Sequence, residues 1–133
     1  MGARLRHFAI VVKDLEKAAS FYEGVFELKR VGQETLDFAS AIYLTDGTIN
    51  LALLNYHGKR GSGLDDAKSF VGAHHFGFQV DDIAKFQAKI EAAGGTFFFD
   101  LGKDQEKENF ERKFKDPDGI IFDISKKGWL GAE

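Results

Sequence analysis

The 133-residue chain contains no cysteine and no long apolar run. Without cysteine, neither a disulfide framework nor a metal site with thiolate ligands can form. No stretch reaches the roughly 18 apolar residues of a membrane span, and no charged-then-apolar leader follows Met1. We therefore expect neither a transmembrane segment nor a signal peptide, and these absences favour a cytoplasmic protein.

The chain also lacks a strong net charge. Its 18 Lys and Arg residues against 21 Asp and Glu residues give a formal charge of −3, and the isoelectric point is near 5.8. This balance provides no electrostatic basis for binding nucleic acid or an anionic membrane surface, and we expect a small-molecule partner instead. The 14 phenylalanines indicate an aromatic core, and the length suits one domain but not two independent cores.

A strand-then-helix stretch occurs twice, at residues 7–15 and 75–83. In each copy a histidine opens an apolar strand, and an aspartate stands where a helical pattern begins. Three further strands are expected after each helix, so the order β-α-β-β-β is repeated and the fold class is α+β. We predict a single domain over residues 1–133, with module one at about 4–55, a connector at 56–73, module two at 74–125 and a tail at 126–133.

The alternation of side chains along each strand separates core residues from candidate site residues, because successive side chains point to opposite faces. His7 and His75 share their faces with small residues, and Asp123 lies opposite the apolar face of the last strand. Asn50 has the matching position on the fourth strand. If these faces converge, the four polar side chains line one cavity. The bulky opposite faces are expected to form the core: Phe8, Ile10, Phe76 and Phe78.

A buried carboxylate such as Asp123 is unfavourable unless a partner or a bound cation compensates its charge. Two imidazoles and one carboxylate match a divalent metal site with open positions, as in zinc hydrolytic sites or the facial triad of non-haem iron. Alternatively, Asp123 pairs with a lysine, the histidines form ordinary hydrogen bonds, and Asn50 caps a turn. Recurrence in both modules favours the metal. We predict Zn, Ni, Mn or Fe bound by His7, His75 and Asp123, with Asn50 as a weaker fourth ligand.

Each of the two modules has a histidine on its first strand, and an acid follows four residues after the glycine of Asp-Pro-Asp-Gly. With these features the chain resembles the vicinal oxygen chelate superfamily over residues 4–125. That superfamily includes glyoxalase I, methylmalonyl-CoA epimerase, extradiol dioxygenases and bleomycin-resistance proteins. The resemblance implies two modules that form a curved mixed sheet around a cavity, with helices on the outer face, and a homodimer.

The resemblance also bears on individual positions. His7, His75 and Asp123 match three of the four ligand positions of glyoxalase-like members, although the last ligand is normally Glu. Asn50 stands near the fourth position, where Glu or Gln is usual. Val11 stands where bacterial glyoxalase I tends to have an arginine for the glutathione carboxylate.

The activity implied is that of a glyoxalase-like lyase or isomerase, with proton transfer through a metal-bound enediolate and Asp123 as the base. One alternative is a ring-cleaving Fe(II) dioxygenase, which suits a His/His/Asp triad. Another is a metal-free drug-binding protein that stacks a flat ligand on phenylalanines, although such alternating residues are also typical of a core: Phe97, Phe98, Phe99, Phe110 and Phe114. The single tryptophan, Trp129, suggests that the tail docks on the domain.

Overall fold

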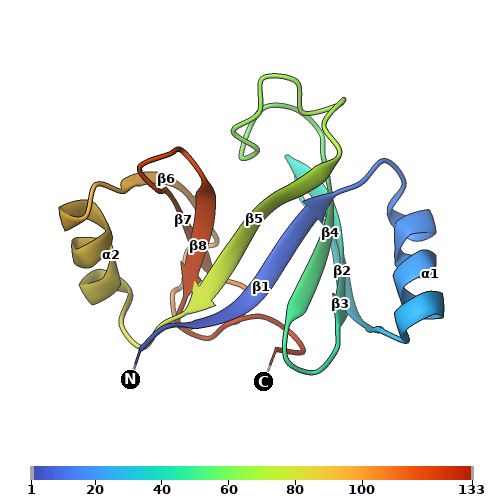
Figure 1. Ribbon diagram of the computed structural model, residues 1–133, viewed down its shortest axis with the longest axis horizontal. Helices are drawn as coiled ribbons and strands as arrows, with labels where there is room; N and C mark the ends of the chain where they lie inside the picture. Colours follow the sequence, from blue (N-terminus) through green and yellow to red (C-terminus); the bar gives the residue numbers. More distant parts are fainter. Residues whose placement is uncertain (1, 133) are drawn as a thin grey trace. The chain divides into compact units, whose positions relative to one another are not determined.

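The computed structural model describes residues 2–132. The order β-α-β-β-β occurs twice along the chain (Figure 1). The first series is β1 (Arg4–Val11), α1 (Leu15–Phe26), β2 (Lys29–Thr35), β3 (Ala39–Thr45) and β4 (Asn50–Tyr56). The second series is β5 (Gly72–Gln79), α2 (Ile83–Ala92), β6 (Thr96–Leu101), β7 (Glu111–Lys115) and β8 (Ile121–Ser125). The predicted α+β class and the two βαβββ modules are confirmed.

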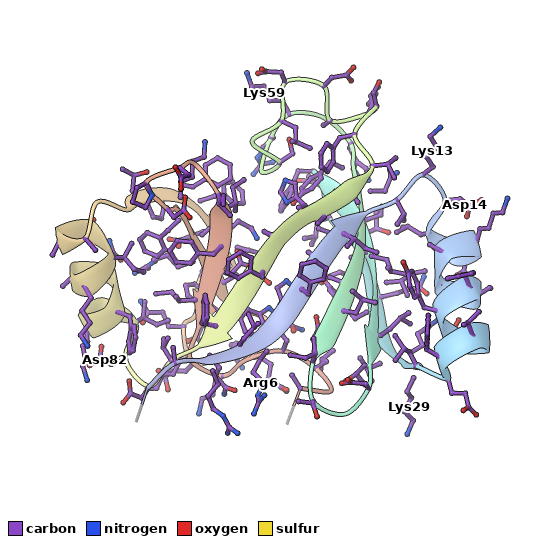
Figure 2. The ribbon with its side chains drawn as sticks, in the orientation of Figure 1. Arg6, Lys13, Asp14, Lys29, Lys59 and Asp82 are labelled. Carbon is purple, nitrogen blue, oxygen red and sulfur yellow. The ribbon has the colours of Figure 1, made fainter. Side chains whose placement is uncertain are left out.

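Both helices begin at the aspartates that the sequence pattern predicts. Asp14 and Asp82 have extended backbones, and their side chains accept hydrogen bonds from the backbone N–H groups of Lys17 and Lys85, each at 3.0 Å. These contacts satisfy one of the unpaired donors at each helix N-terminus, and Figure 2 labels both caps. Within residues 2–132, no helix is long and apolar enough to cross a membrane.

The chain divides into two compact units, and the division falls inside strands β1 and β5. One unit comprises residues 2–7 and 75–129, and the other comprises residues 8–74 and 130–132. In the first unit β5 pairs with β8 in parallel, β8 with β7 and β7 with β6 in antiparallel fashion. In the second, β2, β3 and β4 are antiparallel neighbours. The strand pairing is therefore mixed, whereas the single domain over the whole chain stays a prediction.

Each unit has its own apolar core. In the unit that holds residues 75–129, the buried cluster contains Val80, Ile83, Phe110, Phe114 and Ile124. In the other unit one cluster lies against α1 and contains Ala19, Ile42, Leu44 and Leu53, with Ile10 packed beside it. A second cluster there includes Ala9, Val11, Ala52, Leu54 and Tyr56.

Phe8 is a correction to the predicted core, since its side chain is 39% exposed. Helix α1 packs on β2, β3 and β4, and Ile10, but not Phe8, lies among the residues described as packed against the cluster beside α1. The phenylalanines of the second module do not all lie in the core. Phe110 and Phe114 are buried, whereas Phe97 is half exposed. Alternation identified the faces of these strands but not which face a helix covers.

Candidate metal centre

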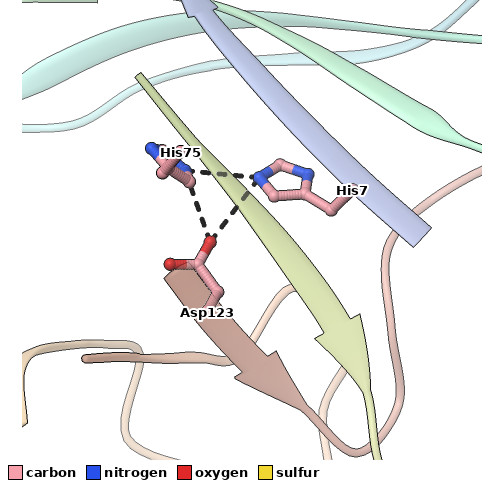
Figure 3. Close-up of side chains that lie close together, drawn as sticks. All are labelled: His7, His75 and Asp123. Atoms are coloured by element: carbon pink, nitrogen blue, oxygen red, sulfur yellow. Dashed lines mark hydrogen bonds and ion pairs between the residues drawn. The ribbon is translucent and has the colours of Figure 1, made fainter. Parts of the chain in front are cut away.

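Three of the predicted site residues come together in the unit that holds residues 2–7 and 75–129. His7 comes from β1, His75 from β5 and Asp123 from β8 (Figure 3). In the parallel pairing of β5 with β8, Gly77 lies opposite Asp123, two residues beyond His75. The side chains of His75 and Asp123 therefore project from the same face, and Nε2 of His7 lies beside them. The three residues are 2% (His7), 3% (His75) and 0% (Asp123) exposed.

The nitrogen and oxygen atoms of this group face one another. The Nε2 atoms of His7 and His75 are 3.4 Å apart, and Oδ2 of Asp123 lies 3.6 Å from the first and 3.3 Å from the second. Two ligand atoms bound to one tetrahedral ion at about 2.0–2.2 Å are separated by about 3.3–3.6 Å. The group therefore has the donor types and the spacing to hold a divalent metal ion.

The hydrogen bonding of Asp123 supports the same conclusion. Among residues 2–132, its Oδ2 is one of two buried side-chain atoms without a hydrogen-bond partner. A buried carboxylate oxygen without a hydrogen bond is unfavourable by about 1–3 kcal/mol or more. Since this oxygen faces two imidazole nitrogens, a cation bound among the three atoms would compensate it.

Two charged residues that the sequence analysis did not assign to the site lie beside it, Glu111 and Lys113 of β7. The Lys113 ammonium lies 2.9 Å from Oδ1 of Asp123, 3.2 Å from Oε1 of Glu111 and 3.3 Å from Nε2 of His75. The other oxygen of Glu111 lies 3.4 Å from Nε2 of His7. Asp123 thus has the lysine partner that was the alternative to a metal, and it also faces both imidazoles.

Alternation along β7 contains the signal for these two residues. Glu111 and Lys113 share one face, and the core residues Phe110 and Phe114 lie on the other. The register places Lys113 directly opposite Asp123 on β8. The face that carries the charges is therefore the face that carries the site.

The charges of this cluster do not balance when both imidazoles are neutral. Glu111 and Asp123 contribute two negative charges and Lys113 one positive charge, and these side chains are 7%, 0% and 3% exposed. One negative charge is left in surroundings that water reaches poorly, which is unfavourable. A proton on an imidazole or a bound metal ion would offset it.

Trp129 holds the His7 ring in place. The two rings are stacked with centroids 4.7 Å apart and planes 5° apart, and the indole Nε1–H donates a 2.5 Å hydrogen bond to Oε2 of Glu111. The indole is 3% exposed, so the predicted docking of the tail is confirmed. The stacking and the hydrogen bond together restrain both His7 and Glu111.

Gly77 makes room for this indole, so we expect Gly77→Ala to be destabilising. A Cβ atom at residue 77 would lie 2.7 and 2.8 Å from two ring carbons of Trp129 and 3.2 Å from Cβ of His7. Overpacking of this kind reduces the free energy of unfolding by about 1–3 kcal/mol. Urea unfolding followed by circular dichroism measures the loss. Gly58→Ala is the control, because nothing lies within 4 Å of its added Cβ; equal stability of the two variants would contradict the tight packing.

Asn50, the predicted fourth ligand, belongs to the other compact unit. It is fully buried, and its Nδ2 donates a 2.9 Å hydrogen bond to the carbonyl oxygen of Leu130. Its role as a metal ligand stays a prediction. Val11, where an arginine for glutathione was expected, is buried in the apolar cluster of the same unit.

Comparisons with proteins of known sequence gave two distant relatives. A probable trivalent organoarsenical cleaving enzyme of Bacillus subtilis (strain 168) is 34% identical over 94 residues, which is 66% of this chain and 55% of the relative. A probable chloroplastic lactoylglutathione lyase of Arabidopsis thaliana is 25% identical over 130 residues, 94% of this chain and 36% of the relative. The chain therefore spans about half or less of these relatives' length.

Solved structures share the fold at low sequence identity. A hypothetical protein from Bacillus halodurans C-125 superposes with a TM-score of 0.78 at 19% identity, covering 96% of both chains. Methylmalonyl-CoA epimerase of Streptomyces coelicolor superposes with a TM-score of 0.76 at 19% identity, covering 95% of this chain and 98% of the epimerase.

A family model also matches the chain, over residues 4–124. That match covers both modules and all three residues of the triad. The chain belongs to the Glyoxalase/Bleomycin resistance protein/Dioxygenase superfamily.

Proposed function

We propose that this protein is a metal-dependent enzyme that acts on a small substrate with two neighbouring oxygen atoms. The observation that supports it is the buried Oδ2 of Asp123, which has no hydrogen bond and faces Nε2 of His7 and of His75 within 3.6 Å. These residues would hold a divalent Zn, Ni, Mn or Fe ion. When bound, such an ion supplies Lewis-acid polarisation of the substrate oxygens.

The chemistry proposed is a lyase or isomerase type of proton transfer at the carbon next to a carbonyl group. Two of the similar proteins are named as a lactoylglutathione lyase and a methylmalonyl-CoA epimerase, which supports this class. A buried carboxylate would take the proton from carbon and return it. The two candidates for this base are Asp123, which the sequence suggested, and Glu111.

The contacts favour Glu111 as the base. Oδ2 of Asp123 faces both imidazole nitrogens and would bind the ion, and Oδ1 contacts the Lys113 ammonium at 2.9 Å, whereas Glu111 is not one of the three ligand residues. Glu111 is held by Lys113 through Oε1 and by Trp129 through Oε2. Two donors thus fix the orientation of this carboxylate beside His7. Asp123 then serves as a ligand, and Glu111 holds the proton.

Elemental analysis and hydrogen exchange test this proposal. The protein as purified, or after incubation with Zn²⁺, Ni²⁺, Mn²⁺ or Fe²⁺, is expected to retain about one equivalent of metal after gel filtration. A panel of α-hydroxy ketones, hemithioacetals and 2-methyl-branched thioesters in D₂O is then followed by NMR for deuterium exchange at the activated carbon. We expect Glu111→Gln to keep the metal and to slow exchange by about 10²–10⁴-fold. A folded protein that retains none of the four ions would contradict the proposal.

Ring cleavage by an Fe(II) enzyme is the second candidate. Two histidines and one carboxylate form the donor set typical of non-haem iron oxygenases, and His7, His75 and Asp123 supply that set without Asn50. Anaerobic addition of Fe(II) and a catechol is expected to produce a charge-transfer band. Absence of the band in protein that contains iron would count against this candidate.

The ion pair between Lys113 and Asp123 favours a metal-free binding protein as a third candidate. Such a protein would bind its ligand equally well after treatment with a chelator, which separates it from both enzymes. The homodimer suggested by the resemblance also stays a prediction, and light scattering after gel filtration measures it.

A further inference from the structure

Lys113 lies against two of the proposed metal ligands, His75 and Asp123. Among the described contacts of residues 2–132, no other lysine or arginine approaches the ligands as closely. The Lys113 ammonium group has three N–H bonds, and three acceptors lie within 3.3 Å: Oδ1 of Asp123, Oε1 of Glu111 and Nε2 of His75. The side chain is 3% exposed. Three acceptors of the site thus lie around this one ammonium group.

The contact with His75 brings Lys113 into competition with a metal ion. An ammonium group has only donors, so Nε2 of His75 must accept this hydrogen bond with its lone pair. A metal ion binds imidazole through the same lone pair. Lys113 and a metal ion on His75 therefore exclude one another at that atom, although Lys113 can keep its contacts with the two carboxylates.

The charges act in the same direction as this competition. With Lys113 present, the cluster carries one excess negative charge for a divalent ion; without it, the cluster carries two. A positive charge this close to the ligands repels a divalent ion. At the effective dielectric constant of such sites, this repulsion lowers the affinity for the ion by several orders of magnitude.

We propose that Lys113 is a resident cation of this site, which holds Asp123, Glu111 and His75 together in metal-free protein and lowers the affinity for divalent ions. The inference deepens the proposed function and depends on its metal site. It assigns to Lys113 a positioning role, in which the residue sets how strongly the site binds metal.

Competition with a chromophoric chelator tests this role without any assay of activity. Wild-type protein, Lys113→Met and Lys113→Gln are titrated with Zn²⁺ and, separately, with Co²⁺ in the presence of the chelator. We expect both variants to bind each ion at least about tenfold more tightly than wild type. Lys113→Gln serves if the methionine variant is too unstable, because its amide can still donate to Asp123.

Lys115→Met is the matched control, since this lysine lies two residues further along β7 and its ammonium lies over the ring of Phe98, at 4.7 Å. We expect its metal affinity to stay within about twofold of wild type, because its described contact is with Phe98 and not with a proposed ligand. Equal or weaker binding by the Lys113 variants would overturn the inference while leaving the metal site intact. If no folded protein in the series binds either ion, the inference and the proposed metal function both fail.

Discussion

Asp123→Asn is expected to lower the affinity for divalent metal by at least about a hundredfold. Loss of an outer partner of a metal ligand already lowers affinity by about 10–100-fold, and this change removes the charge of a proposed ligand itself. Asparagine keeps the shape of the side chain and can still accept a hydrogen bond from Lys113, which lies 2.9 Å from Oδ1 in wild type. A loss of metal affinity in this variant would therefore result from the missing charge and not from a collapse of the site.

The measurement is chelator competition combined with elemental analysis of the purified variant. Asp118→Asn provides the control, because this exposed residue lies in the turn before β8 and makes the same chemical change outside the site. Circular dichroism verifies that both variants are folded. Metal content in Asp123→Asn equal to that of wild type would remove Asp123 from the ligand set and leave Lys113 as its principal partner.

Lys113→Met is expected to reduce the free energy of unfolding by about 3–5 kcal/mol in the presence of a chelator. Removing one partner of a buried ion pair leaves the other charge without compensation, and here two carboxylates, Glu111 and Asp123, lose the same ammonium group. Urea unfolding at neutral pH measures the loss. Lys115→Met is again the control, with an expected loss of about 1 kcal/mol or less from its cation–π contact.

Two further measurements separate this charge effect from a packing defect. In the double variant Glu111→Gln with Lys113→Met, the loss should be smaller than in the single lysine variant, because one of the unpaired charges is gone. A saturating divalent ion should restore part of the stability of Lys113→Met, because a ligand that binds only the folded state stabilises it. A loss that neither the second substitution nor the metal reduces would contradict the electrostatic explanation.

The doubled module and the triad could be predicted because each depends on local pattern. The histidines on two apolar strands and the aspartate on the last strand are visible from alternation, and the caps Asp14 and Asp82 are visible from the helical pattern that follows each of them. Backbone pairing then brings His75 and Asp123 to one face, since β5 and β8 run parallel with Gly77 opposite Asp123.

Three residues beside the triad were harder to assign to the site from the sequence: Glu111, Lys113 and Trp129. The first two are charged and therefore look like surface residues, and the third lies in the tail, outside any regular pattern. Charged residues on a strand are normally solvated, so Glu111 and Lys113 suggest an exposed face unless the register of β7 with β8 is known. The position of Trp129 depends on the space that Gly77 leaves on β5. No periodic pattern in the tail predicts that contact. Phe8 shows the converse, since an apolar residue that alternation assigned to the core is 39% exposed.

The division of β1 between the two compact units determines when the centre can form during synthesis. His7 is made well before residues 75–129, yet it belongs to the unit that they complete, and its stacking partner Trp129 is the last residue of that segment. Contacts between residues so far apart in sequence form slowly, because closing a long loop is entropically unfavourable. A chain in which residue 129 has not yet left the ribosome would hold His7 without the indole that restrains it, so the restrained site forms only after Trp129 has been made.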